Sequence, residues 1–192
     1  MIRQTGLLYK YATELVPFGG IIFHGLSVIS PEGKGILICG KSGAGKSTLA
    51  NRLASKGYGI IDDEISAVLP TTKNSYNIIT LPLLNKRRTI GSVKNIPFST
   101  IAVLKHAVRD VSKYCPISLI LSINSIVTNI WYFPILVRQY PYFMRNVLSL
   151  IAFIPIGVLY HSLQDDSIFD VIRYMTERGG YYGSQKDYTW KT

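Results

Sequence analysis

The sequence predicts a single α/β domain, in which short buried strands alternate with helices. Ile36 to Cys39 is a short, wholly apolar run, typical of a strand that is buried on both faces. A glycine-rich loop and a helical pattern follow it directly, and residues 118–154 are again helical in spacing. The 192 residues suffice for one domain with a real core. We expect residues 1–110 to form the core of this domain and residues 111–192 to complete it, mainly with helices.

The elements on either side of the glycine-rich loop have clear boundaries. Residues 1–22 are expected to form one or two strands or an extended arm, because the segment Gly19 to Ser30 carries short β-prone runs bounded by glycine and proline. The helix after the loop is expected over Ser47 to Lys56, with two leucines on one face. Gly57 is placed to end this helix.

The middle of the chain predicts more strands. Tyr58 to Ile61 and Ile65 to Leu69 are short apolar runs, each expected to be a strand. Pro70 to Ile101 is rich in turn residues and is expected to supply strands and loops around the mouth of a site. Within it, Lys86-Arg87-Arg88 is either a solvated turn or a cluster that binds an acceptor or a phosphate.

The second half of the chain is predicted to be mostly helical. Pro155 to Tyr160 is expected to return as a strand, and Asp165 to Met175 as a helix with Ser167 at its N-terminal cap. Residues 114–137 carry no charge over about 24 residues, a length that allows a membrane span. Prolines and asparagines interrupt this stretch. A buried or partner-facing helix is therefore expected, with a membrane span or a surface helix as the alternatives.

That stretch has a periodic apolar pattern. Leu119, Ile123, Ile126, Ile130 and Phe133 recur at helical spacing and predict one apolar face.

The charge of the chain is strongly basic. It has 21 basic and 11 acidic residues, a net charge of +10, which favours anionic partners without choosing among them. No nucleic-acid-binding motif is present, so no nucleic-acid partner is expected. The two cysteines form no metal-binding cluster, and no signal peptide is recognised, so a cytoplasmic location is expected. Self-association stays open.

The glycine-rich loop carries the strongest motif. Gly40-Lys41-Ser42-Gly43-Ala44-Gly45-Lys46-Ser47 matches G-x-x-x-x-G-K-[ST] at every fixed position, after a buried strand and before a helix. In that context glycines bring backbone amides close to phosphate oxygens, a lysine reaches the β- and γ-phosphates, and a serine hydroxyl ligates magnesium. ATP and magnesium are the expected ligands, and a structural turn without a ligand is the alternative. The residues expected to bind the nucleotide are Gly40, Ser42, Gly43, Ala44, Gly45, Lys46, Ser47 and Thr48.

An acidic pair follows the loop. Asp62-Asp63 lie at the end of a predicted strand, where consecutive side chains point to opposite sides. In phosphoryl transfer one carboxylate organises magnesium and another accepts the proton of the attacking hydroxyl. The alternative is that one aspartate ligates the metal and the other caps a turn.

The order of these motifs resembles a known family. His24-Gly25, a β-hairpin, the glycine-rich loop, a helix ending in Lys56-Gly57 and then Asp62-Asp63 resemble the nucleotide-binding core of HPr kinase/phosphorylase. They are similar, more distantly, to the phosphoenolpyruvate carboxykinase fold. The resemblance implies a PEP-carboxykinase-like kinase core with a mixed sheet and a helical C-terminal half.

The resemblance also implies roles for individual residues. It makes Asp62 the general base toward a serine hydroxyl, with His24 in contact with it. Asp63 then assists metal and phosphate organisation together with Ser47, and Lys46 holds phosphates. Thr48 stands where the bifunctional enzymes carry an acidic residue. The chain looks more like the short stand-alone relatives, some of which resemble enzymes that modify ribosomally made peptides.

Three functions follow as hypotheses. The first is an ATP-dependent kinase that phosphorylates a hydroxyl, a serine in a protein or peptide. The second is a nucleotide-binding regulatory module without turnover, which docks a partner or a membrane through its apolar helices. The third is a kinase for a small metabolite. An ABC-type ATPase is not expected, because no LSGGQ-like signature follows the loop.

Overall fold

The computed structural model describes residues 2–71, 74–81, 95–107, 111–131, 143–162 and 165–177. The N-terminal segment is helical. Helix α1 (Ile2–Leu15) leads into a short 3-10 helix, η1 (Val16–Phe18). Leu8, Ala12 and Val16 are all buried, and their spacing of four residues places them on one helical face. The expectation of strands or an extended arm over residues 1–22 is therefore wrong up to Phe18, because the apolar period there is helical.

The strands and the remaining helices have the following bounds. The strands are β1 (Ile21–Ile29), β2 (Gly35–Cys39), β3 (Gly59–Asp62), β4 (Ile65–Pro70), β5 (Tyr76–Ile79), β6 (Ile96–His106), β7 (Lys113–Pro116) and β8 (Ile156–His161). The helices are α2 (Lys46–Ser55), α3 (Leu119–Val127), α5 (Phe143–Phe153) and α6 (Ser167–Glu177).

The sheet closes into a barrel-like ring, of which the two long strands β1 and β6 are members. Along the ring, β2 pairs with β1, β1 with β4, β4 with β5 and β5 with β6, and β6 pairs again with β2. Strand β1 takes part twice, since residues 21–24 pair with β4 and residues 25–29 pair with β2. Outside the ring, β3 pairs with β1, and β8 and then β7 extend the sheet beyond β6. The β2–β6 and β6–β8 pairs are parallel and the others antiparallel, so the predicted mixed α/β fold is confirmed.

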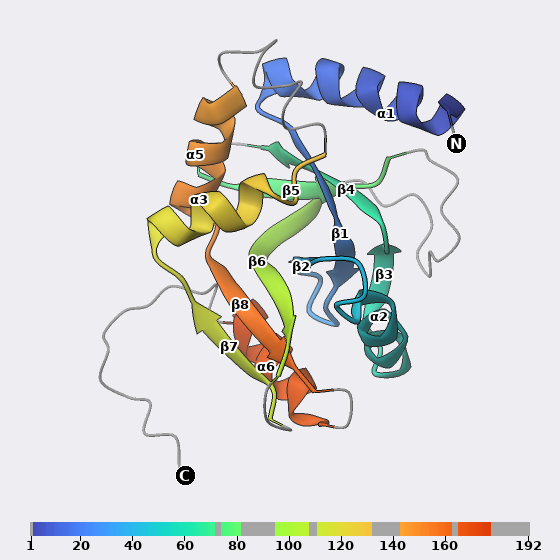
Figure 1. Ribbon diagram of the computed structural model, residues 1–192, viewed down its shortest axis with the longest axis vertical. Coiled ribbons are helices and arrows are strands. Elements are labelled where there is room, and N and C mark those ends of the chain that lie inside the picture. The colour runs from blue at the N-terminus through green and yellow to red at the C-terminus, as the bar shows by residue number, and fades with distance from the viewer. Residues whose placement is uncertain are drawn as a thin grey trace.

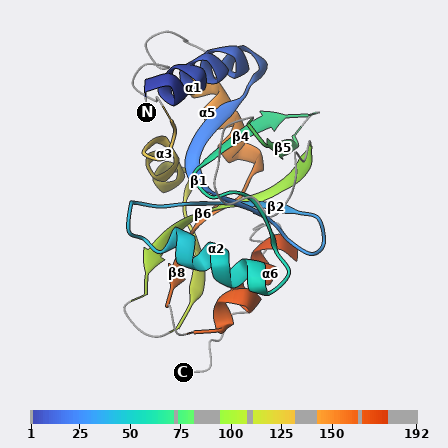
Figure 2. The same cartoon turned by 90° about the vertical axis from the view of Figure 1, so that its right-hand side faces the viewer.

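Two apolar cores form on the two faces of this sheet. Strand β2 shows why, because its alternate side chains point to opposite faces. Ile36 and Ile38 pack with α2 and α6, whereas Leu37 and Cys39 belong to the core beneath α1, α3 and α5. The two groups of helices accordingly gather at opposite ends of the molecule (Figure 1), and the view in Figure 2 looks onto α2 and α6. Burial on both faces explains why β2 is wholly apolar.

Most of the predicted elements in the first half are confirmed. Helix α2 begins one residue earlier than expected and buries Leu49 and Leu53, and Gly57 follows its end with a φ of +86°. The β-run containing His24, the buried strand β2, and strands β3 and β4 all lie where the sequence placed them. The basic cluster Lys86-Arg87-Arg88 lies outside the described residues.

The return strand predicted over Pro155 to Tyr160 is confirmed as β8. The described residues of the second half also supply α3, α5 and α6, and a further strand, β7, of the common sheet. Strand β7 was not predicted, because its four residues are continuous with the apolar stretch that follows. No helix of the described part is long and apolar enough to cross a membrane.

Two details of these helices differ from expectation. Ile126 on α3 and Ile130, which lies beyond the end of that helix, are buried as expected, but Leu119 is 57% exposed, and Phe133 lies outside the described residues. Ser167 is the first residue of α6, and its backbone amide donates to Asp165 Oδ1 at 2.9 Å. The helix is therefore capped by an aspartate before it, and the prediction of Ser167 as the cap is wrong.

Candidate functional site

The glycine loop (residues 40–45) joins the buried end of β2 to the start of α2. Gly43 and Gly45 have φ values of +80° and +91°, in the left-handed region that favours glycine. Gly40 favours glycine for a different reason, since a Cβ there would lie 3.2 Å from the carbonyl oxygen of Leu104, which is a tight contact. The loop conformation therefore follows from its glycines, and it brings backbone amides to the N-terminal end of α2.

A polar pocket of about 460 Å³ opens beside this loop. Three segments line it: strand β1, the loop with the first turn of α2, and the turn between β3 and β4. Its described lining residues are His24, Ser42, Gly43, Ala44, Gly45, Lys46, Ser47, Thr48, Asp63 and Glu64. The structure thus brings together most of the residues singled out from the sequence. Gly40 and Asp62 lie next to the pocket lining without belonging to it.

Lys46 lies folded over the loop. Its Nζ donates to the carbonyl oxygens of Gly40 at 2.6 Å and of Lys41 at 3.2 Å. Burial lowers the pKa of Lys46 below its ordinary value, and the neighbouring Cys39 opposes this shift. The ammonium group therefore stands at the centre of the loop, where a phosphate of a bound nucleotide would compete with the two carbonyls for it.

The two aspartates have different surroundings. Asp62 is 1% exposed, and its Oδ1 accepts hydrogen bonds from the backbone amides of Glu64 at 2.9 Å and Ile65 at 2.8 Å. It therefore holds the turn between β3 and β4. Asp63 lines the pocket, and so does Glu64. The two consecutive aspartates diverge as predicted, and the capping of a turn by one of them was the alternative considered. The role of Asp62 as a base stays a prediction.

His24 lines the same pocket from strand β1. Its ring stacks on Trp131, with centroids 6.3 Å apart and an angle of 25° between the planes. Burial lowers the pKa of His24, Lys46 lowers it further, and Glu64 opposes them. The charges that shift the pKa of His24 are therefore those of Lys46 and Glu64, and the contact with Asp62 that the resemblance implies stays a prediction.

Two further histidines lie behind the loop, and sequence reasoning assigned them no role. His106 Nε2 lies 3.2 Å from the carbonyl oxygen of Gly43. His161 is 1% exposed, and neither of its ring nitrogens has a hydrogen-bond partner in the part of the chain that the structure describes. A Cβ on Gly45 would lie within 4.0 Å of both rings. Because His106 and His161 are opposite each other at the ends of the paired strands β6 and β8, the strand register is the signal that finds them.

The residues expected to bind magnesium, Ser47 and Asp63, both line the pocket. Among the described residues, no three His, Cys, Asp or Glu side chains gather into a metal site of their own. Magnesium is commonly bound by one or two protein oxygens together with phosphates and water. A hydroxyl and a carboxylate in the lining of one pocket fit that kind of site.

The fold and the site together define the class of this protein. It is a mixed α/β protein in which a buried strand, a glycine loop and a helix form one wall of a polar pocket, and an acidic turn forms another. Within that class, the chain belongs to the family described as SynChlorMet cassette protein ScmC, whose family model matches residues 1–123. The matched segment contains every described residue that lines the pocket.

Among solved structures, the Hpr(Ser) kinase/phosphatase from Coxiella burnetii is similar to this chain, with a TM-score of 0.47 and 14% sequence identity. The match covers 80% of this chain and 94% of that chain. A likeness of this degree does not carry an activity from one protein to the other. No curated protein matches the chain.

Proposed function

We propose that the chain is an ATP-dependent kinase with a PEP-carboxykinase-like core, which acts in the cytoplasm on a serine hydroxyl of a protein or a ribosomally made peptide. The observation that carries this proposal is the pocket at the glycine loop. It combines Lys46, Ser47 and Asp63 in its lining, next to the turn that Asp62 holds. A glycine loop and an acidic turn at one pocket suit phosphoryl transfer, which depends on groups that position phosphates, a metal ion and the attacking hydroxyl.

The proposed roles divide between binding and proton transfer. The loop amides and Lys46 bind the β- and γ-phosphates, for which Lys46 leaves the carbonyls of Gly40 and Lys41. Ser47 and Asp63 hold magnesium, which neutralises phosphate charge when it is bound. The residues that this assigns to nucleotide binding extend along the first turn of α2 to Thr48.

In the chemical step, the acceptor oxygen forms a bond to the γ-phosphorus while the bond from that phosphorus to the β–γ bridging oxygen breaks. ADP leaves with the electron pair, and the proton of the hydroxyl passes to a carboxylate. We assign that carboxylate to Asp62, as the resemblance implies. Hydrogen bonds of catalytic groups often become productive only in the substrate complex, so the present engagement of Asp62 in the turn does not exclude it.

The variant Asp62→Asn tests this assignment sharply. Asparagine keeps an Oδ1 that can accept the amides of Glu64 and Ile65, so the turn is retained while the base is lost. With ATP labelled at the γ-phosphate, we expect unchanged nucleotide binding and transfer reduced by about 100-fold or more. The measurement is label incorporation into candidate peptides, a protein extract and a metabolite pool, with nucleotide binding measured separately.

Two companion variants make the result interpretable. Glu64→Gln changes another carboxylate of the same pocket to which no role is assigned, and transfer is expected to stay within a few-fold of the wild-type rate. Asp63→Asn is expected to raise the magnesium concentration that transfer requires. Full transfer by Asp62→Asn would move the role of base to another group, with Asp63 the next residue to test.

One observation favours the second hypothesis, a nucleotide-binding module without turnover. Leu119, Ile120 and Leu121 on α3 are consecutive and exposed by 57%, 79% and 57%. Apolar side chains exposed together are typical of surfaces that contact partners. If the wild-type chain binds ATP but transfers label to none of the three acceptor pools, this module becomes the better explanation.

A further inference from the structure

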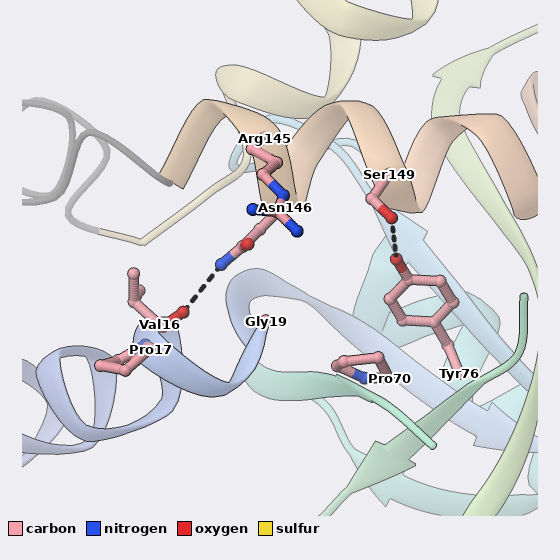
Figure 3. Close-up of a pocket in the computed structure, with 8 residues that line it drawn as sticks. All are labelled: Val16, Pro17, Gly19, Pro70, Tyr76, Arg145, Asn146 and Ser149. Carbon is pink, nitrogen blue, oxygen red and sulfur yellow. Dashed lines mark hydrogen bonds between the residues drawn. The ribbon is translucent and has the colours of Figure 1, made fainter. Parts of the chain in front are cut away.

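A second cavity lies away from the glycine loop, at the other end of strand β1. Its volume is about 620 Å³, within the range that suits a small ligand or a short peptide segment. It lies between η1, the ends of β4 and β5, and helix α5 (Figure 3). The described residues that line it are Val16, Pro17, Gly19, Pro70, Tyr76, Arg145, Asn146 and Ser149. None of them lines the pocket at the glycine loop.

Hydrogen bonds connect the walls of this cavity. Asn146 Nδ2 donates to the carbonyl oxygen of Val16 at 2.8 Å, and the hydroxyl of Tyr76 donates to Ser149 Oγ at 3.1 Å. Both bonds are drawn in Figure 3. Gly19 completes the wall, because a Cβ there would come within 2.7 Å of the Pro70 ring. Helix α5 is therefore held to both other walls, and the cavity is preformed.

Among the described residues that line this cavity, Arg145 carries the one formal charge. Arg145 forms no hydrogen bond or ion pair with any other residue that the structure describes, and no acidic side chain belongs to the described lining. Arg145 lies in the first turn of α5, which contains no acidic residue, so the positive end of the helix dipole adds to its charge. The cavity therefore attracts an anion at the Arg145 side.

The rest of the lining selects the kind of anion. Two prolines, Val16 and the ring of Tyr76 form apolar walls, which favour an apolar or aromatic body. A guanidinium group pairs with a carboxylate through two parallel hydrogen bonds and balances its single charge. A phosphate monoester carries nearly twice that charge at neutral pH, and one arginine leaves part of it uncompensated.

We propose that this cavity binds a carboxylate carried on an apolar or aromatic body. Arg145 pairs with the carboxylate, and the prolines and Tyr76 enclose the apolar part. Such a ligand is either a free carboxylic acid or an acidic residue next to an apolar residue in a peptide. The site does not depend on phosphoryl transfer at the glycine loop, so the two proposals succeed or fail separately.

Calorimetric titration with three probes tests the proposal. The first probe is N-acetylphenylalanine, which carries a free carboxylate. The second is an acetylated and amidated peptide of sequence AFELA, whose only carboxylate is the glutamate side chain. The third is the same peptide with glutamine in that place. We expect binding of the first or the second probe and at least about tenfold weaker binding of the third, because it lacks the charge.

Variants then connect binding to the cavity. Arg145→Gln is expected to lower the affinity for the probe that binds by about tenfold or more. Arg173→Gln changes an exposed arginine on α6, which pairs with Asp170, and should leave binding unchanged. Thermal unfolding of both variants checks that they are folded. The preferred carboxylate probe identifies the source of the ligand. Absence of binding by both carboxylate probes, or binding that Arg145→Gln does not weaken, would overturn the proposal.

Discussion

At the scale of single residues, two glycines have the same backbone geometry in different surroundings. Gly43 in the glycine loop and Gly33 in the turn between β1 and β2 have φ values of +80° and +81°. A Cβ at either position would meet no heavy atom within 4 Å. Alanine therefore costs the same kind of backbone strain at both positions, about 1–2 kcal/mol. They differ because Gly43 lines the polar pocket.

This pair separates folding from ligand binding. Gly43→Ala and Gly33→Ala are expected to lower the free energy of unfolding by similar amounts, measured by urea denaturation. Only Gly43→Ala is expected to weaken binding of magnesium and an ATP analogue, by about tenfold or more, since a methyl group keeps phosphate oxygens away from the loop amides. Equal nucleotide affinity of the two variants would argue against phosphate binding at the loop.

At the scale of elements, β7 and β8 show how tightly adjacent strands pack where a glycine faces an aromatic ring. Gly157 on β8 pairs with Pro116, and the ring of Tyr114 on β7 lies against it. A Cβ on Gly157 would come within 2.4 Å of that ring. Tyr114 is buried, and burial raises the pKa of its hydroxyl to about 12. The ring has therefore little freedom to move away.

Gly157→Ala is expected to lower the free energy of unfolding by about 1–3 kcal/mol, because the added methyl group overpacks the contact between the two strands. A double-mutant cycle with Tyr114→Ala checks the cause. In the Tyr114→Ala background, Gly157→Ala should lower the free energy of unfolding much less, so the losses caused by the two substitutions should not add. Additive losses would mean that the ring is not what the methyl group meets.

At the scale of the whole molecule, long-range strand pairing couples the site to overall stability. His161 ends β8, and its surroundings come from three other segments: Arg52 on α2, His106 on β6, and Asp165 before α6. Burial lowers the pKa of His161 below its usual 6.5, Arg52 and His106 lower it further, and Asp165 opposes them. Burial likewise lowers the pKa of His24. Both rings are therefore favoured in the neutral form when the chain is folded.

The free energy of unfolding should consequently fall on acidification. Well above the unfolded pKa of about 6.5, both histidines are neutral in the folded and in the unfolded chain, so they do not change the free energy of unfolding with pH. Below it the unfolded chain binds protons more readily than the folded chain, so stability is lost as the pH falls. Urea denaturation at pH 7.5, 6.5 and 5.5 measures how the free energy of unfolding depends on pH. His161→Asn should make this dependence shallower. A stability that is flat or rises from pH 7.5 to 5.5 would contradict the prediction.

The elements that the sequence predicted well depend on local rules. A wholly apolar run predicts a buried strand, a glycine pattern predicts the loop, and Gly57 ends α2 because it adopts a positive φ. The sequence does not predict helix α1 because its amphipathic segment leads directly into the β-prone run that begins at Gly19. Strand β7 was missed because a strand of four residues leaves too short a pattern to recognise.

By itself, the sequence determined the loop from Gly40 to Ser47 and the acidic turn after it, since both follow from backbone requirements of nearby residues. Only the tertiary structure decided that Asp62 is buried in the turn while Asp63 lines the pocket, and that His106 and His161 lie behind the loop. The burial of Asp62 depends on the pairing of β3 with β1, and the position of the two histidines depends on the register between β2, β6 and β8. Residues so far apart in the chain meet only through packing, which leaves no local pattern in the sequence.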